Sequence, residues 1–104
     1  MRFTRYPQRL AARLQGYEGP CLATEVGRGG IFLATDQHAA HHTAMKFEIK
    51  LPELGRALRF DGEVLYSKET RGNHHRGLGL RFLDISAEDE ASLIEYLSWL
   101  ESSR

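Results

Sequence analysis

Short runs of alternating apolar and polar residues cover most of the chain, and this is the pattern of half-buried β-strands. In the clearest run, residues 43–51, every second position is apolar from Met45 to Leu51. Runs of this kind are separated by glycine, proline or polar segments. They predict six strands, the first around residues 10–14 and the others at 21–26, 30–35, 43–51, 57–69 and 78–85. A bulge is expected at Asp61–Gly62 in the fifth strand.

The period changes to that of a helix in the last segment, residues 86–103. Ser86 is suited to cap the helix N-terminus, and the acidic residues that follow favour the first turn. Apolar residues then recur on one face, at Leu93, Ile94, Leu97 and Leu100. We expect Tyr96 and Trp99 to belong to the core or to plug the end of a barrel; the lesser alternative is a face that docks a partner.

The pattern predicts a mainly all-β fold, a six-stranded antiparallel β-barrel that the C-terminal α-helix covers. With 104 residues, the chain has room for one domain and one modest core. We divide residues 1–104 into a flexible arginine-bearing lead (1–6), the barrel (7–85) and the helix (86–103).

Composition and charge argue against several classes of protein. The net charge is zero, with 14 basic and 14 acidic residues, so a binder of nucleic acid polymers is not expected. No apolar run approaches the ~20 residues of a membrane span, and the N-terminus lacks a signal peptide. The single cysteine, Cys21, fits a packing role in the reducing cytoplasm.

Catalytic motifs are missing from the sequence. It contains no nucleophile elbow, phosphate loop or paired-cysteine metal site, so we do not expect an enzyme or a bound metal. The histidines fall in two polar loops, at His38, His41 and His42 and at His74 and His75. A metal-dependent hydrolase built on these loops is the remote alternative.

The segment TEVGRGGIFLAT, residues 24–35, concentrates three glycines around one arginine at the start of a strand. Glycines at a bend either serve a tight turn or let a ligand approach the exposed backbone N–H groups. The arginines of the lead would suit phosphates and purine edges as partners. By this pattern alone, both explanations remain open.

Over nearly its full length the chain resembles the PilZ domain family. The most specific similarity is in the second half, where Gly62-Glu63-Val64 precedes a Gly-x-Gly-x-x-Phe strand (Gly77, Gly79, Phe82) and a helix with an acidic start. The resemblance implies a six-stranded barrel with a C-terminal helix. It also implies a bacterial signalling role, because many PilZ domains are receptors for cyclic di-GMP that control motility, pili, exopolysaccharide and biofilm formation.

The family's ligand motifs are an Arg-x-x-x-Arg lead and an Asp/Asn-x-Ser-x-x-Gly hairpin. Arg5 matches the second arginine, but Met1 stands at the first, and Arg2 is one position away from it. Arg9 and Arg13 have the right spacing but the wrong distance from the hairpin. In the hairpin motif, Glu25 takes the acidic position, Gly27 the serine position and Gly30 the closing glycine.

Two functional hypotheses follow from the resemblance. In the first, the chain is a cyclic di-GMP receptor with a weakened motif and no other cofactor, and its ligand residues are Arg2, Arg5, Glu25, Gly27, Arg28, Gly29 and Gly30. The missing hydroxyl and the missing arginine would weaken binding by about 2–4 kcal/mol. In the second, the chain is a degenerate PilZ adaptor that docks an unknown protein, such as a part of the motility or type IV pilus machinery.

Overall fold

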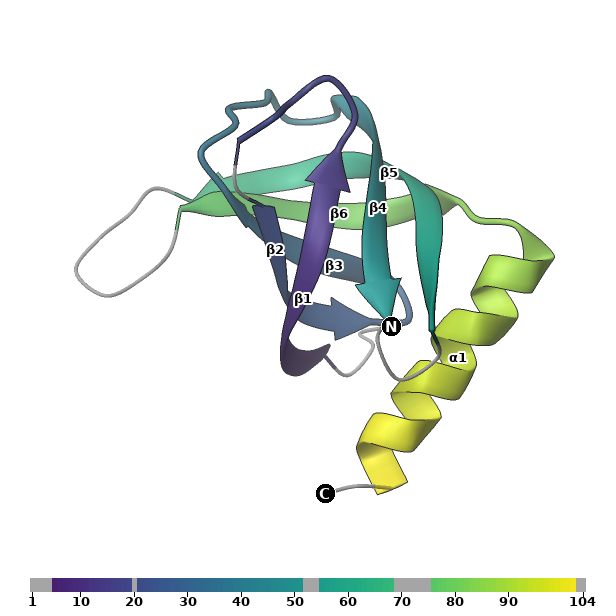
Figure 1. The fold of residues 1–104 in the computed structure, drawn as a ribbon. Helices are drawn as coiled ribbons and strands as arrows, with labels where there is room; N and C mark the ends of the chain where they lie inside the picture. The colour runs from purple at the N-terminus through teal and green to yellow at the C-terminus, as the bar shows by residue number, and fades with distance from the viewer. Residues whose placement is uncertain (1–4, 20, 52–54, 69–75, 103–104) are drawn as a thin grey trace.

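The computed structural model describes residues 5–19, 21–51, 55–68 and 76–102. Six antiparallel strands form a closed barrel in the order β1-β2-β3-β6-β5-β4, and one helix follows them (Figure 1). The elements are β1 (Arg5–Leu14), β2 (Cys21–Gly27), β3 (Gly30–Thr35), β4 (Ala44–Leu51), β5 (Arg56–Lys68), β6 (Gly77–Asp84) and α1 (Ala87–Ser102). The predicted fold is confirmed.

The inward positions of the strands supply the core. Alternation along β4 buries Phe47, Ile49 and Leu51, while Lys46 and Lys50 face solvent. Every second side chain of a strand points to the same face, so a closed barrel collects the apolar set inside and leaves no strand edge unpaired. The core extends to the helix through the buried side chains Leu93, Tyr96, Leu97 and Leu100.

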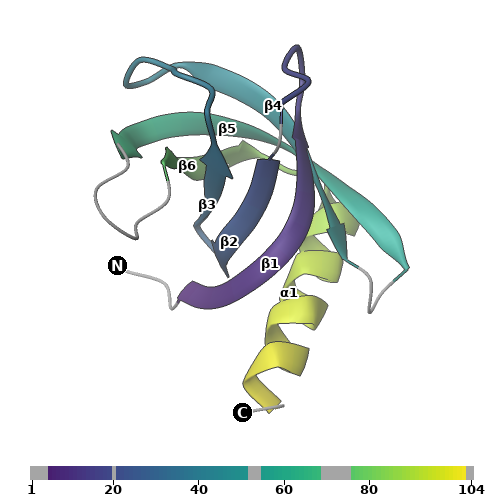
Figure 2. The ribbon, with the colours of Figure 1, turned by 60° about the vertical axis from the view of Figure 1, so that its left-hand side comes forward.

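Helix α1 leaves the end of β6 and runs past the start of β5 (Figure 1 and Figure 2). Ser86 caps it as predicted, because the Asp89 N–H donates to the Ser86 Oγ over 3.1 Å. The Asp89 carboxylate accepts a 2.6 Å bond from Arg56 at the start of β5. These contacts fix the first turn of the helix against the barrel.

Two expectations about single residues need correction. Trp99 is 45% exposed, so it is neither a core residue nor a plug, whereas Tyr96 on the adjacent turn is fully buried. The Trp99 ring stacks beside Tyr96 on the outer side of the helix. In addition, β1 begins at Arg5, two residues before the expected start of the barrel, so Arg5 and Tyr6 belong to the barrel and not to the lead. The rest of the expected lead, residues 1–4, lies outside the described residues.

The glycines that carry the family resemblance in the second half of the chain, Gly62, Gly77 and Gly79, have structural roles. A Cβ at Gly62 would lie 2.7 Å from the Phe47 ring inside the barrel. A Cβ at Gly77 would overlap the Leu33 carbonyl oxygen, and one at Gly79 would overlap the Tyr66 ring. The predicted bulge is present, since the β5–β6 register shifts between Asp61 and Gly62. Only glycine fits these close approaches without displacement of a neighbour.

Candidate ligand-binding site

The glycine-rich segment forms the turn between β2 and β3, and the expected ligand residues that the structure describes lie in this turn or on the adjoining strands. Arg5 of β1 lies opposite Gly27 of β2, and Pro7 lies opposite Glu25. Arg5 and Glu25 therefore occupy adjacent strands, two register positions apart. The two ligand motifs predict that these residues belong to one site, and the β1–β2 register brings their backbones close together.

The closing glycine of the turn has a structural explanation. A Cβ at Gly30 would overlap the carbonyl oxygen of Leu80 in β6 and lie 3.3 Å from the Cα of Arg81. The group that approaches the backbone here is thus a neighbouring strand of the same barrel. Among the described residues, the glycines with left-handed φ are Gly16 and Gly55, so a left-handed conformation does not account for the glycines of this turn.

The turn is held in place by its neighbour strand. The N–H of Phe82 in β6 donates to the carbonyl of Gly29 over 3.1 Å. Arg28 is exposed, and together with Gly29 it borders a hollow of about 350 Å³. The other side of this hollow consists of the end of β6 and the first half of α1, with Phe82, Leu83, Ile85, Glu90, Leu93 and Ile94. A molecule bound at the turn would therefore lie close to the helix.

One row of register positions runs around the outside of the barrel through this turn, and we call it the outer row. It is formed by Arg5 (β1), Gly27 (β2), Gly30 (β3), Arg81 (β6), Glu63 (β5) and Ala44 (β4). Gly27 and Gly30 flank the turn, next to the paired Val26 and Ile31. The row thus sets two positions without side chains between two arginine positions. Gly27 and Gly30 are buried, so Arg28, which is exposed, and Gly29, which is half-buried, form the accessible part of the turn. Arginine is suited to bind an anionic ligand with two parallel hydrogen bonds.

Arg81 and Glu63 were not among the residues expected at the site. The Arg81 Nε donates to the Glu63 Oε1, and the Glu63 Oε2 lies 3.0 Å from Nδ1 of His42. The hydrogen bond from Arg81, and after it that from His42, holds the pKa of the Glu63 carboxyl below its ordinary value. Arg81 follows Gly79 by two positions and shares its face. However, only the pairing of β3 with β6 places it beside Gly30.

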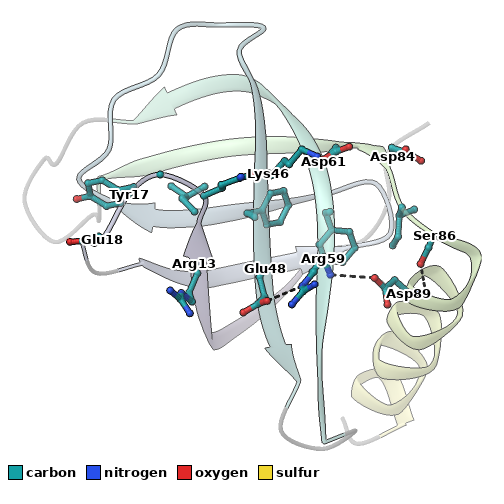
Figure 3. A pocket seen from close by; sticks show the side chains of 16 residues that line it. Arg13, Tyr17, Glu18, Lys46, Glu48, Arg59, Asp61, Asp84, Ser86 and Asp89 are labelled. Carbon is teal, nitrogen blue, oxygen red and sulfur yellow. Dashed lines mark hydrogen bonds and ion pairs between the residues drawn. The ribbon is translucent and has the colours of Figure 1, made fainter.

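A second, larger hollow of about 1100 Å³ lies over β1, β4, β5 and the start of α1 (Figure 3). It contains none of the expected ligand residues. Two of its cations pair with carboxylates, Lys46 with Asp61 at 3.9 Å and Arg59 with Glu48 at 3.2 Å. Five carboxylates line it against three cations, which disfavours an anionic ligand; the charged residues are Arg13, Glu18, Lys46, Glu48, Arg59, Asp61, Asp84 and Asp89.

The remaining expectations concern histidines and the lead. In the described part of the chain, no group of three or more potential ligands is placed to hold a metal ion. His41 and His42 instead stack on each other with ring centroids 3.8 Å apart. His74 and His75 lie outside the described residues, and so does Arg2. No helix within the described ranges is long and apolar enough to cross a membrane.

Comparison with solved structures finds the same barrel and helix in other proteins. The motility inhibitor MotI/DgrA of Bacillus subtilis matches with a TM-score of 0.85 and 20% identity, over 100% of this chain and 52% of its own. YcgR of Escherichia coli, solved in complex with c-di-GMP, matches with a TM-score of 0.77 and 18% identity, over 99% and 46%.

A tetrameric PilZ domain from Xanthomonas campestris matches with a TM-score of 0.62 and 22% identity, over 86% of this chain and 53% of its own. This chain spans about half the length of these three proteins, and at such identities the likeness concerns the fold alone. No curated protein sequence matches the chain. The PilZ domain family itself matches over residues 1–99, which includes the strands, the turn and most of α1. The chain therefore belongs to the PilZ domain family.

Proposed function

We propose that this PilZ domain is a signalling receptor that binds cyclic di-GMP on the outer face of the β2–β3 turn. The observation that carries the proposal is the register of Arg5 opposite Gly27, two positions from Glu25. It supports a site in which the second arginine of the lead motif and the hairpin motif act on one ligand. Arg2, Arg28, Gly29 and Gly30 complete the proposed set.

The roles of these residues follow from their chemistry. The guanidinium group of an arginine matches a phosphate or the O6/N7 edge of guanine with two parallel hydrogen bonds. The Glu25 carboxylate is suited to accept hydrogen bonds from guanine N–H groups. Gly29, which is half-buried beside the exposed Arg28, would let the flat base approach the backbone of the turn. E. coli YcgR, a similar structure, was solved with this dinucleotide bound, which adds support.

Affinity is expected to be weak. Gly27 offers no hydroxyl where the family has serine, and Met1 offers no guanidinium where it has arginine. A receptor of about 1 µM affinity would lose roughly 1.5 to 3 decades through these two changes. We therefore expect a Kd between about 30 µM and about 1 mM.

Calorimetric titration of cyclic di-GMP tests the proposal. Glu25→Ala should weaken binding, while Glu95→Ala, on the exposed face of α1, should leave it unchanged. Gly27→Ser restores the family's hydroxyl and should tighten binding by about 2- to 10-fold. Thermal unfolding of each variant checks that the fold is intact. Absence of binding in both the natural chain and Gly27→Ser at about 10 mM ligand, roughly ten times the weakest expected Kd, would contradict the receptor hypothesis.

The second candidate is an adaptor that acts on another protein without the nucleotide, and the departures at Met1 and Gly27 favour it. Two large apolar side chains, Leu83 and Trp99, are each 45% exposed. The similarity to a motility inhibitor directs the search toward motility machinery, with pilus assembly and biofilm formation as the wider processes. We expect either role to be carried out in the cytoplasm and without catalysis. Pull-down with the folded domain and with Trp99→Ala distinguishes a specific partner from background.

A further inference from the structure

We propose that Arg81 of β6 is an additional ligand residue of the nucleotide site, where its guanidinium contacts a phosphate or guanine edge of cyclic di-GMP. The inference rests on the proposed function and extends it to a residue outside both family motifs. Arg81 would supply, from a framework strand, a cationic contact of the kind that is missing at Met1.

Arg81 lies next to the β2–β3 turn in the register of the barrel. Arg81 lies opposite Gly30 in the β3–β6 ladder, as Arg5 lies opposite Gly27 in the β1–β2 ladder. The two arginine positions are separated by three strand spacings, about 14 Å. Between them, Gly27 and Gly30 are buried, and the exposed Arg28 and the half-buried Gly29 form the accessible part of the turn. A ligand seated over the turn would therefore have an arginine position on each side.

The Arg81 side chain points away from the barrel core. Leu80, the neighbour of Arg81, is fully buried, and the Arg81 side chain is 52% exposed, so Arg81 projects outward. Its contact with Glu63 uses Nε. No described residue accepts a hydrogen bond from its two terminal amino groups. These two groups form the end of the planar fork that phosphate recognition uses.

Glu63, the carboxylate that accepts a hydrogen bond from Arg81, is itself held in place by a second contact. One oxygen of Glu63 accepts from Arg81, and the other lies 3.0 Å from Nδ1 of His42. The backbone N–H of His42 donates to the Val64 carbonyl over 2.8 Å, and His42 adopts a left-handed φ of 71°. Glu63 is thus clamped from two sides. A guanidinium anchored at Nε to a fixed carboxylate loses less freedom when a ligand arrives.

The test is calorimetric titration of cyclic di-GMP into the natural chain, Arg81→Ala and Arg81→Lys. Arg59→Ala is the matched control, since Arg59 is also an exposed arginine with one carboxylate partner, Glu48. Arg59 lines the larger hollow and not the β2–β3 turn. We expect Arg81→Ala to weaken binding by about 10- to 100-fold. Arg81→Lys, which keeps the charge without the fork, should weaken it less. Arg59→Ala should stay within about 2-fold of the natural chain.

A folding defect in a variant would also reduce binding, so a second measurement is made on the natural chain. The Nε–Hε resonance of Arg81, assigned by comparison with Arg81→Lys, should shift on titration with cyclic di-GMP. Equal affinities for the natural chain and Arg81→Ala, or an unmoved Arg81 resonance at saturation, would overturn this inference and leave the proposed receptor standing. Absence of any binding to the natural chain and to Gly27→Ser would overturn both.

Discussion

Tyr96 of the C-terminal helix donates a 2.9 Å hydrogen bond to the Oε1 of Gln8 in the first strand, across 88 positions of sequence. The Tyr96 ring is fully buried, so the bond forms at the junction of the helix and the barrel. The two ends of the chain are joined there by a polar contact at the margin of the apolar core. Helix docking thus depends on a specific hydrogen bond as well as on apolar burial.

Removal of this hydroxyl should loosen the junction. Tyr96→Phe is expected to lower the free energy of unfolding by about 1 kcal/mol, because the bond is lost and the Gln8 amide stays partly buried. Urea denaturation followed by circular dichroism measures the change. Ser98→Ala, at an exposed position of the same helix, is the control and should be nearly neutral. Equal stabilities of Tyr96→Phe and the natural chain would show that the hydroxyl is dispensable.

The closing glycine of the ligand motif should matter for stability in the absence of any ligand. Gly30→Ala would force a methyl group against the Leu80 carbonyl oxygen, a backbone atom that cannot rotate away. We expect a loss of about 1–3 kcal/mol in urea denaturation. Gly79→Ala is the matched control, because its new methyl group would meet a side chain, the 41% exposed ring of Tyr66, and not a backbone atom. A Gly30→Ala chain as stable as Gly79→Ala would contradict the steric explanation.

The Glu63 cluster should contribute to the acid sensitivity of the fold. Arg81 first, and His42 second, lower the pKa of the Glu63 carboxyl in the folded state. A lowered pKa stabilises the folded state above the ordinary carboxyl pKa, and this contribution is lost as the pH falls through the lowered value. Between about pH 6 and about pH 3, the urea midpoint should therefore fall more for the natural chain than for Glu63→Gln. Glu95→Gln should follow the natural chain; if Glu63→Gln does so too, the cluster has no part in acid unfolding.

The single thiol should be inert until the barrel opens. Cys21 is buried, and burial raises its pKa from 9.0 to about 11. At about pH 8 the thiolate fraction is then ~100-fold lower than in the unfolded chain. We expect slow reaction with a disulfide reagent in native buffer and fast reaction in denaturing urea. Above about pH 9 the unfolded chain loses this proton first, so stability should fall. Fast labelling of the native protein would show that Cys21 is accessible.

Local pattern was sufficient for most of the fold. Alternation identified the strands, because a half-buried strand needs an apolar residue at every second position. The change to helical period at Ser86, with a capping side chain and an acidic first turn, identified α1. The bulge at Asp61–Gly62 and the burial of Tyr96 also followed from the sequence.

The candidate site could be predicted only in part. Arg5, Glu25 and the turn glycines were found because they match motifs of a family, and the β1–β2 register brings Arg5 and Glu25 close together. Arg81 and Glu63 lie in segments that carry the family resemblance but outside both ligand motifs, so nothing in the sequence assigned them to the site. Trp99 was misassigned, because helical spacing places it near Tyr96 but does not say how far the barrel surface extends around the helix.

The chain by itself thus determined its elements, its inward-facing residues and the glycine turn, since each depends on interactions between near neighbours in sequence. The tertiary structure alone decided that β3 pairs with β6, that Leu80 makes Gly30 obligatory, and that two arginine positions flank the β2–β3 turn. These features depend on register between strands about fifty residues apart in sequence. That register is fixed by closure of the whole barrel around its core, and no local pattern encodes it.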